Sequence, residues 1–308
     1  MDLLAGIRNY TSTRQWLTWG MVLVVFTVIT SPVSASKISE EGYAYNKGGF
    51  AHAVRSGKTD LVHQYLKAGM DPNVPIRKDA VYSPDGSSRF VDVKPGTTYV
   101  LHRAESPAVL EVLLKNGADP NLRSEPNRRT PLFKALQRRR QQNNVKKVSM
   151  LLEHGADPNV SDQYGNTPLL EAIEWLPGSP PKKPTLSKSM RRALPKKQRE
   201  KMLVQRKKMY QRQKKRYEKT HKQVMEIVRL LLKNGADPNV PQVDKKYRSP
   251  DQLPLFVSIE KQAKTLTRTL LKKGADPSVR TKSGQTVKKW ARENEHGWAV
   301  DVLSSRTD

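Results

Sequence analysis

The chain has 308 residues, of which 36% are hydrophobic and 6% aromatic, too lean for one large core but sufficient for an elongated repeat array. Its 56 Lys and Arg against 29 Asp and Glu give a formal charge of +27, which indicates an anionic partner such as a nucleic acid, an anionic lipid or cell-wall surface, or an acidic protein. The absence of cysteine excludes disulfides, thiolate metal sites and cysteine nucleophiles.

Residues 1–35 have the pattern of a secretory signal peptide. Arg8 and Arg14 precede an uncharged stretch whose segment from Leu17 to Ile29 is strongly apolar, and Val33-Ser34-Ala35 offers small residues for cleavage. This apolar segment is short for a membrane span, which needs about 20 residues. We therefore expect export to the periplasm or the cell exterior, with cleavage after Ala35. The alternatives are a single-pass membrane anchor and a buried helix of the domain.

One phrase recurs five times in residues 36–308, with repeat ends near positions 74, 122, 160, 240 and 279. It reads Gly-Ala-Asp-Pro-Asn with small changes, and each copy follows an apolar helical run. The glycine supplies a left-handed helix cap, the Asp-Pro step extends the chain, and the Asn can bond its own backbone in the following turn. We expect structural roles at these repeat positions and at the helix starts: Gly117, Asp119, Thr130, Gly155, Asp157, Thr167, Gly235, Asp237, Gly274 and Asp276.

A second phrase begins helices. Thr130-Pro131-Leu132 and Thr167-Pro168-Leu169 each place a Thr N-cap before a Pro at the first helical position. The two phrases together resemble the ankyrin repeat, whose signature joins a Thr-Pro-Leu-His-x-Ala helix start to a Leu-Leu-x-x-Gly-Ala-Asp-x-Asn end. The resemblance extends over about residues 43–305, apart from two insertions. It implies an all-α solenoid of about six helix pairs with short β-hairpin fingers, and a role in binding a protein partner.

The first insertion, residues 75–96, is predicted to enlarge one of these fingers. Ala80-Val81-Tyr82 and Phe90-Val91-Asp92-Val93 read as two short strands around a turn at Ser83–Gly86. A solvated loop is the alternative. Candidate partner-binding residues here are Tyr82, Arg89 and Phe90.

The second insertion, residues 177–222, is basic and divides the fourth repeat. A Pro-rich linker opens it, and the stretch after Pro195, which has no Gly or Pro for almost forty residues, predicts one continuous helix from about Lys196 to Lys233. Apolar residues seven apart form a stripe that is too narrow for a coiled coil. These are Leu203, Tyr210, Tyr217, Val224 and Leu231. Residues 182–222 hold 18 Lys and Arg against two Glu, so this segment supplies +16 of the charge.

Three interpretations of the basic insertion remain open. It is a solvated helix with no specific partner, it docks on an anionic membrane or envelope surface, or it binds an acidic protein. A nucleic-acid groove would mix more aromatic residues with the charge, and an exported protein meets little nucleic acid. The candidate partner-binding residues of this segment are Arg206, Tyr210, Arg212, Lys214, Lys215, Arg216 and Tyr217.

Nothing in the sequence predicts a catalytic site, a metal site, a cofactor or a small-molecule substrate. The six His have no metal-ligand spacing, and no nucleophile elbow or phosphate loop occurs. The repeated Asp residues recur once per repeat, which favours turn geometry over a carboxylate site. We expect a non-catalytic protein-binding module or scaffold outside the cytoplasm. The alternatives are an immunity or inhibitor-type protein that caps a toxic enzyme, and a basic adaptor that docks on an anionic membrane or nucleic acid.

Overall fold

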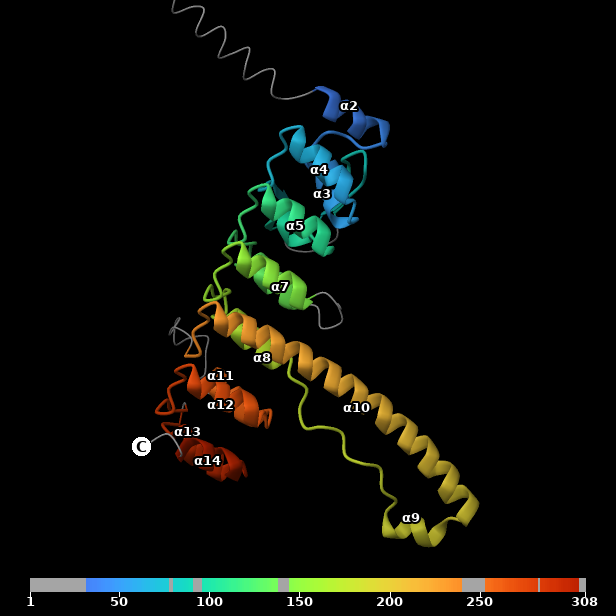
Figure 1. Cartoon of the computed structure of the whole chain (residues 1–308), viewed down its shortest axis with the longest axis vertical. Coiled ribbons are helices and arrows are strands. Elements are labelled where there is room, and N and C mark those ends of the chain that lie inside the picture. The colour runs from blue at the N-terminus through green and yellow to red at the C-terminus, as the bar shows by residue number, and fades with distance from the viewer. Residues whose placement is uncertain are drawn as a thin grey trace, which may run out of the picture. The chain divides into compact units, whose positions relative to one another are not determined.

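The computed structural model of the chain is mostly helical (Figure 1). It describes residues 32–77, 80–90, 96–137, 144–239, 253–281 and 283–304. Most of the expected signal peptide, residues 1–31, lies outside that part. No helix within the described ranges is long and apolar enough to cross a membrane. The chain divides into two compact units, the first made of Met1–Pro95 and Tyr99–Ala118 and the second of Gly96–Thr98 and Asp119–Asp308.

Unit 1 contains two helix pairs and a preceding helix. The bounds are α2 (Pro32–Glu40), α3 (Lys47–Arg55), α4 (Thr59–Lys67), the 3₁₀ turn η1 (Val100–Arg103) and α5 (Pro107–Lys115). The second pair, η1 and α5, therefore begins with a short 3₁₀ turn where the resemblance implies a full helix. Helix α2 packs against α4 and its Ile38 is fully buried, so α2 covers the exposed side of the first pair. The expected cleavage point after Ala35 falls within α2.

The first insertion forms the predicted hairpin, but its second strand begins earlier than expected. Strand β2 (Ala80–Tyr82) pairs antiparallel with β3 (Ser88–Phe90), and Val81 stands opposite Arg89. The expected continuation of the second strand, 91–93, lies outside the described residues. Two further short strands, β1 (Pro75–Arg77) and β4 (Thr97–Tyr99), flank this hairpin in the chain.

The hairpin folds back over the start of α3. Ala44 N donates to Pro84 O at 2.9 Å, and His52 Nδ1 donates to the Tyr82 carbonyl at 2.6 Å. Gly48 and Gly86 meet so closely that a Cβ on Gly48 would overlap the Gly86 carbonyl, so a residue with a side chain would push the hairpin away. The insertion therefore forms the expected hairpin, and the structure places this hairpin against the start of α3.

Unit 2 contains four helix pairs and the basic insertion. The bounds are α6 (Pro131–Gln137), α7 (Asn144–Glu153), α8 (Pro168–Glu174), α9 (Lys188–Ala193), α10 (Lys196–Lys233), α11 (Pro254–Glu260), α12 (Lys264–Lys272), α13 (Val287–Glu293) and α14 (Gly297–Ser304). With the two pairs of unit 1, the described residues form the six helix pairs of the predicted all-α solenoid. Helix α10 has the bounds that its lack of Gly and Pro predicts.

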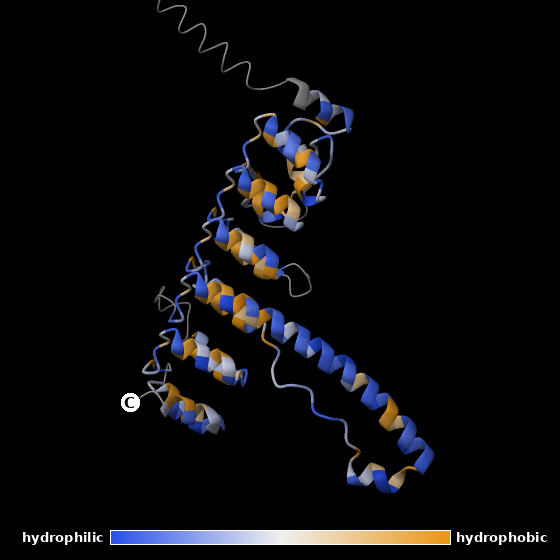
Figure 2. Cartoon of the chain, in the orientation of Figure 1, coloured by the Kyte–Doolittle hydropathy of each residue, from blue (hydrophilic) through white to orange (hydrophobic). Residues whose placement is uncertain are grey.

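Only the last turns of α10 belong to the repeat core. Val224, Ile227, Val228 and Leu231 are buried there, and this end of the helix packs against α8 and α7. Their three- and four-residue spacing places them on one helix face. The rest of α10 continues past α8 toward α9 and is mostly hydrophilic, with one short hydrophobic patch near its α9 end (Figures 1 and 2). The insertion is thus a helical extension of a core helix.

Asparagines at the repeat ends connect each repeat to the next. Asn121 Nδ2 donates to Gly155 O at 2.9 Å, and Asn121 Oδ1 accepts from Asp157 N at 2.8 Å. Asn159 makes the same pair of bonds with Gly235 O and Asp237 N. Asn239 repeats the arrangement once more, with Gly274 O and Asp276 N. The last copy carries Ser278 in place of Asn, so this ladder ends with the final pair.

The aspartates of the same phrase hold the local turn. Asp71, Asp119, Asp157, Asp237 and Asp276 each accept the backbone N–H two residues on, at 2.7–2.8 Å. This agrees with the expected turn geometry of the repeated Asp. The Asn was expected to bond its own turn, and that expectation was wrong: the Asp carboxylate already occupies the local donor, which leaves the longer-range amide free to cross to the next repeat.

Candidate functional site

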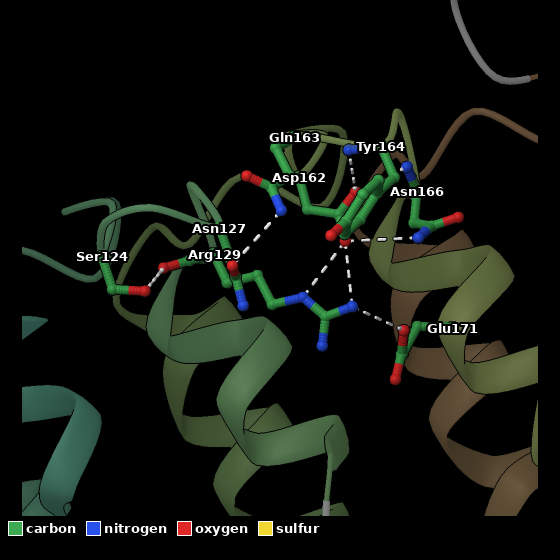
Figure 3. A network of polar contacts seen from close by, with 8 residues as sticks. All are labelled: Ser124, Asn127, Arg129, Asp162, Gln163, Tyr164, Asn166 and Glu171. Carbon is green, nitrogen blue, oxygen red and sulfur yellow. Dashed lines mark hydrogen bonds and ion pairs between the residues drawn. The ribbon is translucent and has the colours of Figure 1, made fainter. Parts of the chain in front are cut away.

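Two turns of unit 2 are hydrogen-bonded to each other and form the candidate site (Figure 3). We call residues 123–129 and 161–166, which precede α6 and α8, the two-finger surface. Gln163 N donates to Asn127 O at 3.1 Å, and Gln163 Nε2 donates to Asn127 Oδ1 at 3.3 Å. Because both backbone and side chain bridge the two turns, the fingers support each other.

The carboxylate of Asp162 is the centre of the contacts behind this surface. Its side chain is fully buried and accepts hydrogen bonds from Tyr164 N at 2.9 Å, Asn166 N at 3.0 Å and Asn166 Nδ2 at 3.2 Å. Arg129 Nε and a terminal guanidinium nitrogen donate to the same oxygen, Oδ2, at 3.1 and 2.9 Å. A buried carboxylate is stable only when it is paired and hydrogen-bonded in this manner.

Arg129 links the first finger to that centre. Its side chain is 20% exposed, and its guanidinium also lies 3.6 Å from the Glu171 carboxylate and 5.5 Å from the centroid of the Phe133 ring. The Arg129 carbonyl accepts hydrogen bonds from Ser124 N at 2.9 Å and Ser124 Oγ at 3.0 Å. Both fingers are therefore held in a defined conformation before any partner arrives.

Side chains typical of protein interfaces project from this rigid base. Tyr164 is 52% exposed, and Arg128, at φ 54°, is exposed at the tip of the first finger beside the half-buried Asn127. Tyrosine and arginine are the residue types that carry most binding energy at protein interfaces, and a fixed loop loses little entropy on binding. The sequence analysis missed these residues because Arg128, Asp162 and Tyr164 look like ordinary turn residues, and the pairing of the two turns is visible only in the fold.

Some of the predicted partner-binding residues of α10 contact the chain itself. A guanidinium nitrogen of Arg206 donates to Thr185 O at 2.9 Å, and another lies 3.7 Å from Met190 Sδ. Arg206 thus fastens the linker that leads from α8 to α9 along the helix. Tyr210 is half-buried on the same side of α10.

Tyr217 lies at the base of the insertion. Its ring stacks on that of His221 at 5.7 Å, and both line a cavity of about 210 Å³ together with the start of the linker after α8 and the turn between α11 and α12. Burial raises the pKa of the Tyr217 phenol. The cavity lies at the point where the insertion departs from the repeats. Lys261, which lines the cavity, donates a hydrogen bond from Nζ to the Glu174 carbonyl at 3.2 Å.

The remaining predicted residues divide between exposed and hairpin positions. Arg212, Lys214, Lys215 and Arg216 are exposed on α10, with Lys214 Nζ 3.7 Å from the Glu218 carboxylate. In the hairpin, the Tyr82 hydroxyl accepts a hydrogen bond from Arg77 N at 3.0 Å. Arg89 and Phe90 lie on β3, but their side chains fall outside the described part.

The predicted repeat positions lie where the motif requires. Thr167 Oγ1 accepts from Leu170 N at 3.4 Å and caps α8, and Gly117, Gly155, Gly235 and Gly274 have φ between 83° and 91° in the left-handed region. Thr130 is buried, but within the described residues its hydroxyl makes no hydrogen bond. His102 is likewise buried, 6% exposed. Across the described ranges, no group of three or more His, Cys, Asp or Glu could hold a metal ion.

Comparison with known proteins agrees with this architecture. The ankyrin-repeat family model, described as ankyrin repeats in three copies, matches residues 99–180, which include both fingers. An ankyrin repeat protein of Acanthamoeba polyphaga mimivirus is 35% identical over 72 residues, which are 23% of this chain and only 12% of that protein's length.

A solved structure extends the likeness to most of the fold. The crystal structure of EF0377, an ankyrin repeat protein, covers 85% of this chain and 98% of its own, with 19% identity and a TM-score of 0.50. Ankyrin repeats are protein–protein interaction modules. The chain therefore contains ankyrin repeats at residues 99–180, and its fold is that of an ankyrin-repeat solenoid.

Proposed function

We propose that the chain is a non-catalytic binding module that holds a protein partner on the two-finger surface. The observation that carries this proposal is the cross-bridged pair of turns, which displays Tyr164 and Arg128 on a base fixed by the buried Asp162. A catalytic role would require a nucleophile or an acid–base pair in a cleft, whereas this surface offers rigid contact residues.

Affinity capture from native extract tests this role. We would compare the full-length protein with a Tyr164→Ala/Arg128→Ala variant and with a control, Arg292→Ala/Lys288→Ala, which alters two exposed residues of α13. We expect the double variant to lose at least about tenfold of the captured partner, because truncated hot-spot residues cost about 2 kcal/mol or more. Equal capture by all three proteins would refute the two-finger site.

We further propose that the protein acts outside the cytoplasm. The basic residues, apolar segment and small residues of 1–35 support export, and cleavage after Ala35 would leave the buried Ile38 in the mature chain. Fractionation with N-terminal sequencing tests this: a mature chain that begins at Ser36 agrees with export. An intact N-terminus in a membrane fraction indicates the single-pass anchor, and an intact chain in the cytoplasm refutes both.

A second role, that of a basic adaptor, is favoured by the exposed part of α10. This basic part of the helix lies beyond the repeat core. It would bind an anionic surface while the two-finger surface holds a protein partner. The immunity-type alternative makes a different prediction for the capture experiment: its partner would be an enzyme that is bound one to one and inactivated.

A further inference from the structure

Between Lys197 and Lys222, a narrow sector of α10 carries lysines alone among its charged residues. Lys197, Lys201, Lys208, Lys215, Lys219 and Lys222 are all exposed. At 100° per residue they fall within a sector about 60° wide, and from first to last they span about 38 Å at 1.5 Å per residue. We call these six residues the lysine stripe. The stripe lies along the straight part of α10 that extends past α8 (Figure 1).

No carboxylate neutralises the stripe. Within the described residues, none of the six lysines forms an ion pair, and the two glutamates of the segment, Glu200 and Glu218, lie on the flank of the helix. The first acidic residue on the same face is Glu226, in the part of the helix that packs on the repeats. The positive charge is therefore available to a partner.

The opposite face of α10 is occupied by the insertion itself. Arg206 bonds to Thr185 O, and a guanidinium nitrogen of Arg199 donates to Arg191 O at 3.1 Å. Leu186, next to Thr185, is buried, while Tyr210 and Tyr217 are half-buried on this side. The returning linker thus covers the side of α10 that carries Arg199, Arg206 and the two tyrosines, and it leaves the lysine stripe facing outward.

The residue types of the stripe indicate the chemistry of its partner. An acidic protein would be held mainly by arginine forks and aromatic anchors, and a nucleic acid by stacked aromatic rings. Both tyrosines and two of the arginines lie on the covered face, and the exposed Arg212 and Arg216 lie beside the lysine stripe and not within it. Lysine is a compact, hydrated point charge that suits a diffuse anionic plane. Val204, 65% exposed, is the only large apolar residue on the stripe, so the helix would adsorb on a surface without inserting.

We propose that the lysine stripe of α10 docks the protein on an anionic lipid bilayer, with the helix lying along the membrane surface. This inference rests on the adaptor role proposed above. It assigns the binding surface of that role to the lysine stripe and its ligand to anionic lipid. It is independent of the two-finger surface, which lies on other residues. Each lysine near such a surface increases binding about fivefold.

Sedimentation with vesicles tests the proposal with the full chain. The probes are neutral phosphatidylcholine vesicles and vesicles with 30% phosphatidylglycerol, and the variant changes all six stripe lysines to Gln. A matched control changes six exposed lysines outside α10, Lys47, Lys67, Lys146, Lys272, Lys273 and Lys288, and loses the same charge. Gln is a good helix former, and circular dichroism checks that α10 is retained.

We expect the stripe variant to bind anionic vesicles at least about a hundredfold more weakly than the native chain, and the control variant less than about tenfold more weakly. Raising the salt from 0.05 to 0.5 M should release the native chain from anionic vesicles, because the Debye length over which charges attract shortens to a few ångströms. Neutral vesicles report any binding by residues 1–35.

Three results would overturn the proposal. Equal losses in the two variants would mean that net charge alone decides binding. Equal binding of the native chain to neutral and anionic vesicles would mean that the lysine stripe does not bind through the negative charge of the lipid. Stripe-dependent binding to polyglutamate without binding to anionic vesicles would assign the stripe to an acidic protein. Partner capture through Tyr164 would be unaffected by any of these results, so the two proposals fail separately.

Discussion

Replacing Asp162 with Ala tests the idea that one buried carboxylate holds the two-finger surface together. The change removes the acceptor of two hydrogen bonds from Arg129, one from Tyr164 N and two from Asn166. It leaves the Arg129 guanidinium with the Glu171 carboxylate at 3.6 Å and the face of Phe133. Two backbone N–H groups of the second finger also lose their partner.

The cost follows from the burial of the pair. Breaking a buried ion pair by removing one partner costs about 3–5 kcal/mol. The Arg129 side chain is 20% exposed and can recruit water, which reduces the penalty, so we expect Asp162→Ala to lower the free energy of unfolding of unit 2 by about 3 kcal/mol. Asp162→Asn retains an acceptor oxygen, so it should cost about half as much.

Amide hydrogen exchange at residues 160–175, recorded at increasing urea concentrations, measures the effect. Exchange reports local opening even when a repeat array unfolds in steps. A double-mutant cycle with Arg129→Ala separates the pair from the rest. Because the two side chains share their bonds, the double variant should cost less than the sum of the single variants. A loss below about 1 kcal/mol, or strictly additive losses, would refute the role of Asp162.

Other predictions address the repeats, the helix base and unit 1. Asn159→Ala removes two inter-repeat hydrogen bonds and should lower the free energy of unfolding by about 2 kcal/mol in urea, whereas Asn234→Ala, whose amide bonds only Leu230 O in its own helix, should cost clearly less. Equal costs would contradict the ladder. Leu231→Ala, fully buried at the base of α10, should cost about 3 kcal/mol and exposed Val204→Ala less than about 0.5 kcal/mol, as thermal unfolding would show; similar values would mean that the core does not include the end of α10. Burial, together with Tyr43 and Tyr45, raises the pKa of the Tyr65 phenol in the folded state, so the unfolded chain loses this proton first as pH rises. The contribution of Tyr65 to the stability of unit 1 should therefore be constant below pH about 10 and fall above it by up to about 1.4 kcal/mol per pH unit, so Tyr65→Phe should show a shallower fall; an unchanged slope would contradict this assignment.

The repeats and the long helix could be predicted because their signals are local. The left-handed Gly, the Asx turn of the Asp and the Thr-Pro helix start each act within a few residues, and the stretch from Lys196 to Lys233 contains no helix breaker. Such features depend little on the rest of the chain. The inter-repeat role of Asn159 was missed because its partner, Gly235, lies 76 residues further along the chain.

The site could not be predicted because it depends on contacts between distant turns. The hairpin could be recognised from its strands, but its position over α3 depends on the close approach of Gly48 to Gly86. The hydrogen bonds between Asn127 and Gln163 join residues that are 36 positions apart in the chain, and no sequence pattern in either turn predicts them. Arg206 was predicted to contact a partner because it belongs to a basic run. In the structure its guanidinium instead donates a hydrogen bond to Thr185 O of the returning linker.

Site-specific photo-cross-linking in the native host tests the central claim most directly. A photoreactive residue would replace Tyr164 on the fingers, Lys215 on the lysine stripe or, as a control, Arg292 on α13. We predict a protein adduct from position 164, a lipid adduct from position 215 and neither from position 292. The same adducts at all three positions, or none from position 164, would contradict a protein-binding module whose repeats hold the partner on the two-finger surface.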